Sequence, residues 1–427
     1  MKDSGIPWIG EIPKDWEVVH IKHYCNNVYA GGTPQSNNLA YWDGNIPWIP
    51  SGSCQNNIIT EAPKFITQEG FENSSTKLIP PYTTVMAMTG ATCSNTGYVT
   101  FQTCMNQSVV AFIQKDGVFS KYLYYTLQAA KQEILTHQTG GAQSGINVED
   151  CKNIIIPFIS FEEQKAIAEF LDRKCGEIDE LMALQDKMIE ELKAYKQSII
   201  TETVTKGLNP NVPLKDSGIE WIGEIPQHWK NIRLKEVFRL RTGTTPKDFE
   251  KGLDSDSLIN WFTPSDIAEM NCELKKSERH LSKDVINKEG ILLNPIGTLI
   301  FVGIGASAGK IGYSLIESYS NQQITNLIPN EDKIVGKYIY YYLLADRKRI
   351  RDNAFFTTLP IINNSYLSSI KILTPPLSEQ QEIADYLDKK CSEIDSLIEL
   401  KQQKIEELKD YKKSIIYEYV TGKKKVS

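Results

Sequence analysis

The chain is one unit of about half its length written twice. Residues 3–22 and residues 216–235 are identical at twelve of twenty positions, and both contain WIGEIP. A longer pair, residues 163–205 and residues 379–421, is identical at 26 of 43 positions. Self-similarity on this scale constrains the architecture before any local pattern does. A duplicated chain can fold with pseudo-twofold symmetry and can address two sites related by a dyad.

The bulk properties indicate a globular protein with more than one core. A chain of 427 residues is long enough for two ordinary domains, and 41% of its residues are hydrophobic. No stretch approaches the ~20 apolar residues of a membrane span, and the N-terminal sequence has no apolar signal core. The eight cysteines form no CxxC pair or other metal-ligand spacing. We therefore expect reduced thiols, no contact with a membrane and a cytoplasmic location.

Each copy contains a globular segment that mixes short β-like runs with turns rich in Gly, Pro and Asn. Such β-like runs occur at 84–88, 98–101 and 108–113 in the first copy and at 297–302 and 311–315 in the second. One helix is expected in each segment, at 119–135 and at 335–351. The tyrosines of the second of these helices, at 338 and 340–342, are expected to pack in the core, because the first copy repeats the pattern.

A long helix with a repeating apolar seam closes each copy. Apolar residues recur at alternating steps of three and four, which is the spacing of a coiled coil. Neither seam could remain exposed, so we expect the two helices to pair with each other as antiparallel rods of roughly 60 Å. A homodimerising coiled coil is the alternative, and it needs two chains to bury what one chain can bury alone. The seam residues are Ile178, Leu181, Gln185, Met188, Leu192, Tyr195 and Ile199 in the first helix, and Ile394, Leu397, Lys401, Leu408, Tyr411 and Ile415 in the second.

The predicted fold class is α+β, with two pseudo-twofold-related globular domains separated by an antiparallel pair of long coiled-coil helices. The predicted boundaries are an N-terminal arm at 1–22, a first globular domain at 23–158, a first long helix at 159–206, a linker with the repeat of the arm at 207–235, a second globular domain at 236–374, a second long helix at 375–422 and a basic tail at 423–427.

This order of motifs resembles the specificity (S) subunits of type I restriction-modification systems. The resemblance is carried by the twin WIGEIP segments with Trp16 and Trp229, by Gly32-Thr33-Pro34 and by Pro47-Trp48-Ile49. It is carried further by the helix openings at Glu163-Gln164 and Glu379-Gln380 and by the LKxYKxSII blocks at 192–200 and 408–416. The match spans nearly the whole chain, and the duplicated order of the motifs is more specific than any one of them.

The resemblance implies a non-catalytic, sequence-specific DNA-binding subunit. Each globular domain would be a target-recognition domain that reads one half of a split site in double-stranded DNA. The helices would set the spacing of the two halves and dock two methyltransferase (M) subunits, and restriction/motor (R) subunits would join that core. No cofactor is expected in this chain, whereas S-adenosylmethionine and ATP with Mg²⁺ are expected on the partner subunits.

Three segments invite an enzymatic interpretation, and each is incomplete. Phe301-Val302-Gly303-Ile304-Gly305 matches the turn that holds S-adenosylmethionine in methyltransferases, but a hairpin loop fits the sequence that follows it better. Gly305…Gly309-Lys310 is one residue short of a P-loop and has Ile311 where Ser or Thr is required. Ile79-Pro80-Pro81-Tyr82 has isoleucine where an adenine pocket needs Asn or Asp. The five histidines form no metal or triad set.

The two globular segments differ in the groups that they could offer to DNA. Residues 20–150 contain 11 Asn and 10 Gln and no arginine, whereas residues 230–370 contain 12 Lys and 7 Arg. Asn and Gln pair with adenine and Arg with guanine, although amides also populate loops for structural reasons. The DNA-binding candidates are Lys64, Lys77, Thr89, Asn95, Gln138, Gln143 and Ser144 in the first segment, and Lys275, Lys276, Arg279, Lys310, Arg347, Arg349 and Arg351 in the second.

Two other classes of protein remain as alternatives. A stand-alone DNA methyltransferase would bind S-adenosylmethionine by itself, and the incomplete motifs argue against it. A coiled-coil scaffold that does not bind DNA would not need two domains of different surface charge. For the cluster at Arg347–Arg351, the alternative to phosphate binding is that the cations complement the C-terminus of a helix.

Overall fold

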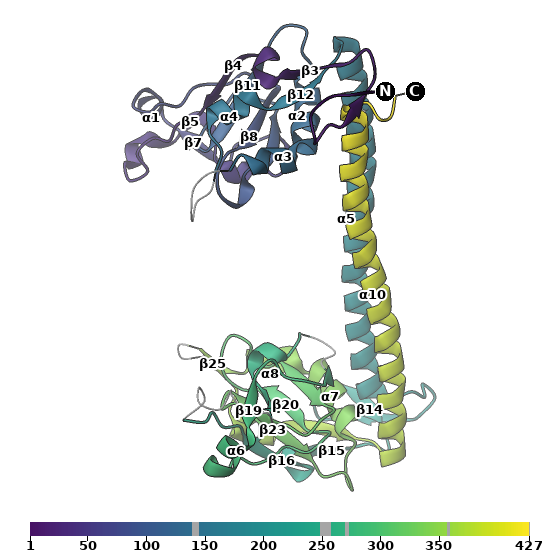
Figure 1. The fold of residues 1–427 in the computed structure, drawn as a ribbon. Helices are drawn as coiled ribbons and strands as arrows, with labels where there is room; N and C mark the ends of the chain where they lie inside the picture. The colour runs from purple at the N-terminus through teal and green to yellow at the C-terminus, as the bar shows by residue number, and fades with distance from the viewer. Residues whose placement is uncertain (139–144, 248–257, 270–272, 357–358, 427) are drawn as a thin grey trace. The chain divides into compact units, whose positions relative to one another are not determined.

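The computed structural model describes residues 1–138, 145–247, 258–269, 273–356 and 359–426. The chain divides into two compact units (Figure 1). Unit 1 comprises Met1–Gln185 and Gln403–Ser427, and unit 2 comprises Asp186–Gln402. Each unit therefore holds one globular part together with one portion of each long helix.

Unit 1 contains a five-stranded sheet in the order β4-β11-β8-β9-β6 and a three-stranded sheet in the order β10-β5-β7. The pairs β6–β9 and β10–β5 are parallel, and the other pairs are antiparallel. Short two-stranded sheets join β1 to β2 and β3 to β12. The strands are β1 (Lys2–Asp3), β2 (Glu11–Ile12), β3 (Glu17–His20), β4 (Cys25–Ala30), β5 (Trp42–Ile49), β6 (Asn57–Ile59), β7 (Lys64–Ile66), β8 (Thr83–Ala87), β9 (Thr96–Val99), β10 (Cys104–Met105), β11 (Val109–Gln114) and β12 (Ile155–Phe158).

Unit 2 repeats the five-stranded and the three-stranded sheet of this topology and adds the pair β24–β25. Its sheets have the orders β16-β23-β20-β21-β18 and β19-β17-β22, and β18–β21 and β17–β22 are the parallel pairs. Two-stranded sheets join β13 to β14, β15 to β26 and β24 to β25. The strands are β13 (Leu214–Asp216), β14 (Glu224–Pro226), β15 (Lys230–Arg233), β16 (Phe238–Thr242), β17 (Leu258–Phe262), β18 (Glu273–Leu274), β19 (His280–Ser282), β20 (Leu299–Val302), β21 (Ile311–Ser314), β22 (Tyr319–Ser320), β23 (Ile324–Pro329), β24 (Phe355–Phe356), β25 (Pro360–Ile361) and β26 (Lys371–Thr374).

Each expected helix of the globular segments is broken into two pieces. Residues 119–135 form α2 and most of α3, with Ala130 between them, and residues 335–351 form α7 and most of α8, with Asp346 between them. The tyrosines of α7 are buried as expected, each at 1% exposure or less. The helices are α1 (Gln68–Glu72), α2 (Ser120–Ala129), α3 (Lys131–Thr136), α4 (Val148–Asn153), α5 (Phe161–Lys206), α6 (Lys283–Glu289), α7 (Gly336–Ala345), α8 (Arg347–Asp352), α9 (Asn364–Ser369) and α10 (Leu377–Val420).

The two long helices begin and end at local signals in the sequence. At the start of α5, the Ser160 hydroxyl accepts a hydrogen bond from the Glu163 backbone N–H, and the Glu163 carboxylate accepts one from the Ser160 N–H. This reciprocal capping box satisfies N–H groups that have no partner within the helix. Gly207 and Gly422 follow the last residues of α5 and α10 with φ of 75° and 70°, a left-handed conformation that glycine adopts without strain.

In each unit, α5 and α10 pack side by side and antiparallel. In unit 1, Lys412 Nζ lies 2.7 Å from Asp179 Oδ1, and in unit 2, Lys196 Nζ lies 2.6 Å from Asp395 Oδ1. Lys196 and Lys412 occupy the same position of the repeated helix, and so do the two aspartates. The mixed α and β fold, built twice around paired long helices, confirms the predicted fold class.

The predicted phase of the seam was wrong in part. Leu181 and Tyr195 of α5 are exposed, as are Leu397 and Tyr411 of α10. Residues that pack instead include Cys175, Ile189 and Lys196, each 5% exposed or less. The spacing of apolar residues cannot place Lys196 in the seam, because this lysine is buried only through its ion pair with Asp395.

Each globular part is attached to its long helix by the same buried contacts. The Gln164 side chain of α5 accepts a hydrogen bond from the Phe119 N–H at 2.9 Å, and Gln380 of α10 accepts one from the Val335 N–H at 2.8 Å. About two helical turns further along α5, Asp172 accepts a hydrogen bond from the Tyr125 hydroxyl at 2.7 Å and forms an ion pair with Lys121 at 2.6 Å. In α10, Asp388 makes the equivalent contacts with the Tyr341 hydroxyl at 2.6 Å and with Lys337 at 3.0 Å.

Among the described helices, none combines the length and apolar character that a membrane crossing needs.

Candidate nucleic-acid interface

The described candidates of unit 1 lie on loops and at the start of β7. Lys64 and Lys77 are exposed, and each ammonium lies over an aromatic ring: Trp42 at 5.6 Å and Tyr29 at 5.1 Å. Stacking of this kind holds a cation in place while leaving it open to a second partner. The remaining candidates of this unit are Thr89, Asn95 and Gln138, whereas Gln143 and Ser144 lie outside the described residues.

The three described polar candidates already have partners inside unit 1. Asn95 is half-buried, and its side-chain oxygen accepts a hydrogen bond from Lys131 Nζ at 2.8 Å. Thr89 precedes the turn between β8 and β9, and its backbone forms a bridge with Gly145. Gln138 is half-buried, and its N–H bonds to the Leu135 carbonyl at the end of α3. The structure thus gives Asn95 a role in positioning Lys131.

The basic candidates of unit 2 form two groups. Lys275, Lys276 and Arg279 are exposed on the segment between β18 and β19, and Lys275 lies 3.7 Å from Glu273. The other group gathers around Glu269: Lys310 Nζ lies 3.3 Å from one carboxylate oxygen, and Arg347 Nη2 lies 2.5 Å from the other. Burial alone would raise the pKa of Glu269, but hydrogen bonds and charge from Arg347 and Lys310 lower it below its usual value.

The arginine run 347–351 does not close the longer helix, as the sequence suggested, but forms the separate helix α8. Arg349 binds the fully buried carboxylate of Asp346 with two hydrogen bonds, so its main task is to hold the break between α7 and α8. Burial raises the pKa of Asp346, which Arg349 partly offsets. Arg351 is exposed. Of the three arginines, Arg347 is engaged by Glu269 and Arg349 by Asp346, so the exposed Arg351 is the best placed for a ligand.

A pair of loops that sequence reasoning did not select has the same construction in both units. Loop 1 (residues 31–34) follows β4, and loop 2 (residues 243–246) follows β16. The N–H of Gly31 bonds to the Val109 carbonyl, and the N–H of Gly243 bonds to the Ile324 carbonyl. A tryptophan from the neighbouring sheet donates its indole N–H to each loop: Trp48 to the Gly32 carbonyl at 3.0 Å, and Trp261 to the Thr244 carbonyl at 3.1 Å.

Each loop presents an exposed threonine that donates to an exposed glutamine. Thr33 bonds to Gln107 and Thr245 bonds to Gln322. The proline after each threonine is buried, so the loop backbone is fixed while the hydroxyl faces outward. The aligned Gly-Thr-Pro and Asn-Gln positions were the sequence signal that could have identified these pairs.

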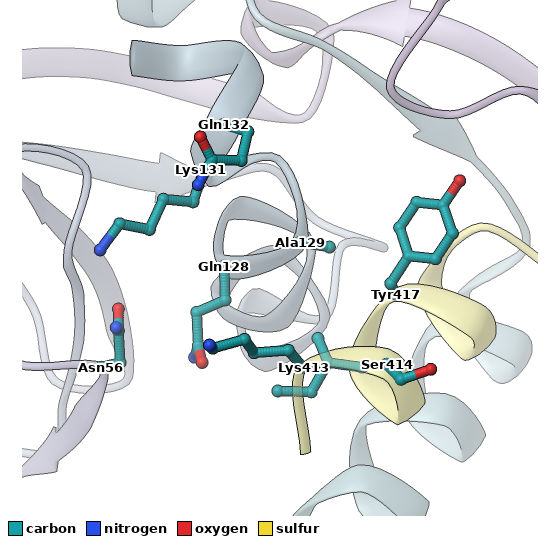
Figure 2. A pocket seen from close by; sticks show the side chains of 9 residues that line it. Asn56, Gln128, Ala129, Lys131, Gln132, Lys413, Ser414 and Tyr417 are labelled. Carbon is teal, nitrogen blue, oxygen red and sulfur yellow. The ribbon is translucent and has the colours of Figure 1, made fainter. Parts of the chain in front are cut away.

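One hollow of unit 1 lies between α2–α3 and the C-terminal portion of α10. It has a volume of about 530 Å³, and its lining includes Gln128, Lys131 and Lys413. In Figure 2, Lys131 extends toward Asn56, and the Gln128 and Lys413 side chains approach each other. The amide nitrogen of Gln128 is buried without a hydrogen-bond partner in the protein. These donors suit an anionic or carbonyl group, and they include no nucleophile paired with a base.

The segments that suggested enzymatic chemistry have ordinary structural roles. Phe301 lies in β20, which forms an antiparallel hairpin with β21, so the hairpin interpretation of this segment is confirmed. Within the described ranges, no group of His, Cys, Asp and Glu is arranged to hold a metal ion. Burial raises the pKa of the Cys25 and Cys54 thiols to about 12, so these thiols stay protonated and unreactive at neutral pH.

Comparison with known proteins gives one consistent result. The model of the type I restriction modification DNA specificity domain matches residues 13–194 and 226–410, once in each half of the chain. The specificity subunit of the type I restriction enzyme MjaVIII from Methanocaldococcus jannaschii is 28% identical over 439 residues, covering 97% of this chain and 94% of that protein. The EcoKI specificity subunit of Escherichia coli is 21% identical over 400 residues, covering 88% and 82%.

Solved structures share the fold. A structure described for complex assembly and conformational transition of the type I R-M system superposes with a TM-score of 0.75 at 16% identity, covering 96% of this chain and 98% of that chain. The HsdS subunit from Thermoanaerobacter tengcongensis superposes with a TM-score of 0.54 at 16% identity and the same coverage.

Proposed function

The chain belongs to the family of type I restriction-modification DNA specificity subunits, and we propose that each of its units reads one half of a bipartite target in double-stranded DNA. The observation that carries this proposal is one topology built twice with different exposed side chains. Residues 20–150 contain no arginine, whereas residues 230–370 contain seven. Because base edges are read by side chains, two surfaces on one scaffold suit two different half-sites.

Methylation-sensitive sequencing tests this proposal directly. DNA from cells that express this chain with its cognate M subunit should carry methylation at one split sequence, with two constant parts and a gap of fixed length. Methylation at a continuous site, or at no defined site, would contradict the reading of two halves.

We propose that the long helices dock two M subunits, one through each unit. Three positions of the repeated helix are apolar and exposed in both copies. Apolar side chains exposed in this way mark a surface that another protein covers. They are Leu181 (47% exposed), Leu184 (45%) and Tyr411 (53%) in unit 1, and Leu397 (46%), Leu400 (61%) and Tyr195 (57%) in unit 2. Changing Leu181 and Leu184 to Gln should remove one M subunit of two, as measured by mass photometry of the complex. Leu397 and Leu400 provide the matched pair.

The helices also provide a way to set the gap between half-sites, because α5 and α10 each run through both units. Inserting one heptad after Gln185 and another after Gln402 keeps the helix pairing within each unit and adds roughly 10 Å of helical rise. We expect the gap to change and both half-sites to persist. A change of half-site at constant gap would show that the helices read sequence.

This chain needs no cofactor for recognition, and S-adenosylmethionine and ATP with Mg²⁺ belong on the M and R subunits of the assembly. The place of such an assembly is the cytoplasm, where the DNA is. The purified chain should therefore bind duplex DNA but transfer no labelled methyl group and hydrolyse no ATP. Stoichiometric methyl transfer by the pure chain would favour the alternative, a stand-alone methyltransferase.

A further inference from the structure

Loop 1 and loop 2 keep the same exposed side chains although the surfaces around them have diverged. The Thr33–Gln107 and Thr245–Gln322 pairs lie at the protein surface. A hydrogen bond between two exposed side chains adds little to stability, because water satisfies both groups equally well. The fold itself is held at these points by the glycine N–H bonds, the buried prolines and the tryptophan N–H bonds. Retention of the exposed pair in both copies therefore points to a shared ligand.

A positive charge stands beside each loop, and the two units supply it from opposite sides. Tyr29 of β4 lies opposite Ala111, and Arg241 of β16 lies opposite Asn326, so Tyr29 and Arg241 are equivalent positions two residues before their loops. In unit 1 the cation is Lys77, whose ammonium lies 5.1 Å from the centre of the Tyr29 ring. In unit 2 the cation is Arg241 itself.

In both units, the strand that precedes the loop contacts the segment that precedes the next long strand of the five-stranded sheet. In unit 1, the Tyr29 hydroxyl donates to the Leu78 carbonyl at 3.4 Å. In unit 2, Arg241 Nη2 donates to the carbonyls of Leu292 at 3.2 Å and Leu293 at 2.5 Å. The positive charge is therefore carried by the segment around Lys77 in unit 1 and by the facing strand, at Arg241, in unit 2. In both units it lies at the same contact between the two segments. A purely structural contact would not require a positive charge in both units, since the tyrosine hydroxyl forms the hydrogen bond to the facing carbonyl without one.

In unit 2 the cation and the loop border a small depression of about 180 Å³. Its lining includes Arg241, Gly243, Thr244, Asn294 and Ser320, and is polar apart from Ile291 and Leu292. Arginine or lysine, hydroxyl, side-chain amide and backbone N–H groups are the groups that contact DNA phosphates. Phosphate is also the feature that two half-sites of different sequence have in common.

We propose that in each unit the loop, its Thr–Gln pair and the adjacent cation bind a phosphate of the DNA backbone, so that both half-sites are held by the same sequence-independent contact. This proposal rests on the proposed function, since it presupposes DNA as the ligand. It assigns Thr33, Gln107 and Lys77 to this role in unit 1, and Thr245, Gln322 and Arg241 in unit 2.

The test measures DNA affinity of the full chain with its cognate M subunit over a range of KCl concentrations. One duplex carries the target that sequencing identifies, and a second carries the same bases in scrambled order. The variants are Lys77→Gln, the double variant Thr33→Ala with Gln107→Ala, and the matched double variant Thr245→Ala with Gln322→Ala. Lys115→Gln is the control, because it removes an exposed lysine elsewhere in unit 1.

We expect Lys77→Gln to weaken binding to both duplexes by the same factor, roughly three- to tenfold, and to reduce the slope of log K against log salt by about 0.9. The two double variants should each weaken both duplexes equally, with thermal unfolding unchanged. A loss confined to the target duplex would assign these residues to base reading and overturn the proposal. Unchanged DNA affinity with weaker binding of the M subunit would assign them to the protein partner and would also overturn it.

The same measurements separate a failure of half-site recognition from a failure of the phosphate contact. A wild-type complex that binds both duplexes equally would contradict the proposed function, while the salt slope of Lys77→Gln would still test the phosphate contact. A slope equal to that of Lys115→Gln would contradict the phosphate contact and leave half-site recognition intact.

Discussion

Units 1 and 2 share the contacts that attach each globular part to the helices, and they differ in the charged side chains that they expose. The hydrogen bonds of Gln164 and Asp172 to the first globular part are repeated by Gln380 and Asp388 in the second. By contrast, the charged groups differ. Unit 2 has the cluster of Lys310 and Arg347 around Glu269, whereas residues 20–150 of unit 1 contain no arginine. Attachment to the helix is therefore constrained, whereas the recognition surface is free to change.

Exchanging a globular domain tests this separation most severely. Replacing residues 23–158 with the equivalent of another family member should replace one half-site completely and leave the other intact. The donor should carry equivalents of Lys121 and Tyr125, because these bond to Asp172 on the retained helix. Methylation-sensitive sequencing reads the result, and an exchange of residues 236–374 is the reciprocal control. Loss of both half-sites from a folded chain would contradict the independence of the units.

Glycine substitutions probe whether loop 1 and loop 2 are equally constrained. A Cβ on Gly31 would lie 1.9 Å from the Met105 carbonyl oxygen, and a Cβ on Gly243 would lie 2.2 Å from that of Asn321. Gly31→Ala and Gly243→Ala should each destabilise their own unit by about 3 kcal/mol, because backbone atoms must move apart. Gly52→Ala is the control, since nothing lies within 4 Å of its Cβ.

Hydrogen exchange measures that effect locally. Protection should fall in β4 and β11 for Gly31→Ala and in β16 and β23 for Gly243→Ala. Equal loss of protection in both units from either variant would show that the units unfold together.

The two interhelical ion pairs should differ in strength. The Lys196 side chain is 4% exposed and that of Lys412 is 23% exposed, while their aspartate partners are 36% and 51% exposed. Lys196→Met should cost about 1–2 kcal/mol of stability, because it leaves a half-buried carboxylate without its strongest partner. Lys412→Met should cost less than about 1 kcal/mol, because water screens that pair. Urea unfolding monitored in each unit would detect the difference, and equal costs would contradict it.

The smallest expected effect is a difference in alkaline stability. Burial, with charge from Asp172 and Tyr82, raises the pKa of Tyr98 in unit 1 to about 12, from a usual value of 10. For a raised pKa, the stability contribution is complete below the unfolded value of 10 and is lost as the pH rises through 12. Tyr98→Phe should therefore flatten the decline of unit 1 stability between those limits. Tyr195 is exposed, so Tyr195→Phe should leave the loss of stability at alkaline pH unchanged. If Tyr195→Phe flattened this loss as much as Tyr98→Phe, the effect could not be assigned to the buried Tyr98.

Much of the architecture could be predicted because the duplication is a long-range signal. The WIGEIP arms, the β runs and the two terminal helices all follow from comparing one half with the other. The phase of the helix seam could not be predicted from apolar residues alone. Lys196 belongs to the seam only because Asp395 of the other helix meets it, and residue spacing within one helix does not report that partner.

The DNA-binding candidates show a similar limit. Lys77 was selectable as an exposed cation, but Arg241 was not, because its equivalence to Tyr29 depends on strand register. Arg349 looked like a ligand-binding residue until Asp346 was seen to hold it. Charge composition identifies which residues could meet phosphate, whereas the fold decides which of them are already engaged by a carboxylate.

The ion pairs between α5 and α10 have a consequence for the ancestry of the chain. Lys196 and Lys412 are one ancestral residue, and Asp179 and Asp395 are another. Each copy of the helix thus carries both ends of the bond, so the helix is complementary to itself. Genetic crossover within the helix repeat would join any two globular segments and restore both bonds without a compensating mutation. A self-complementary helix therefore lets recognition domains be reshuffled between genes while the framework that holds them stays intact.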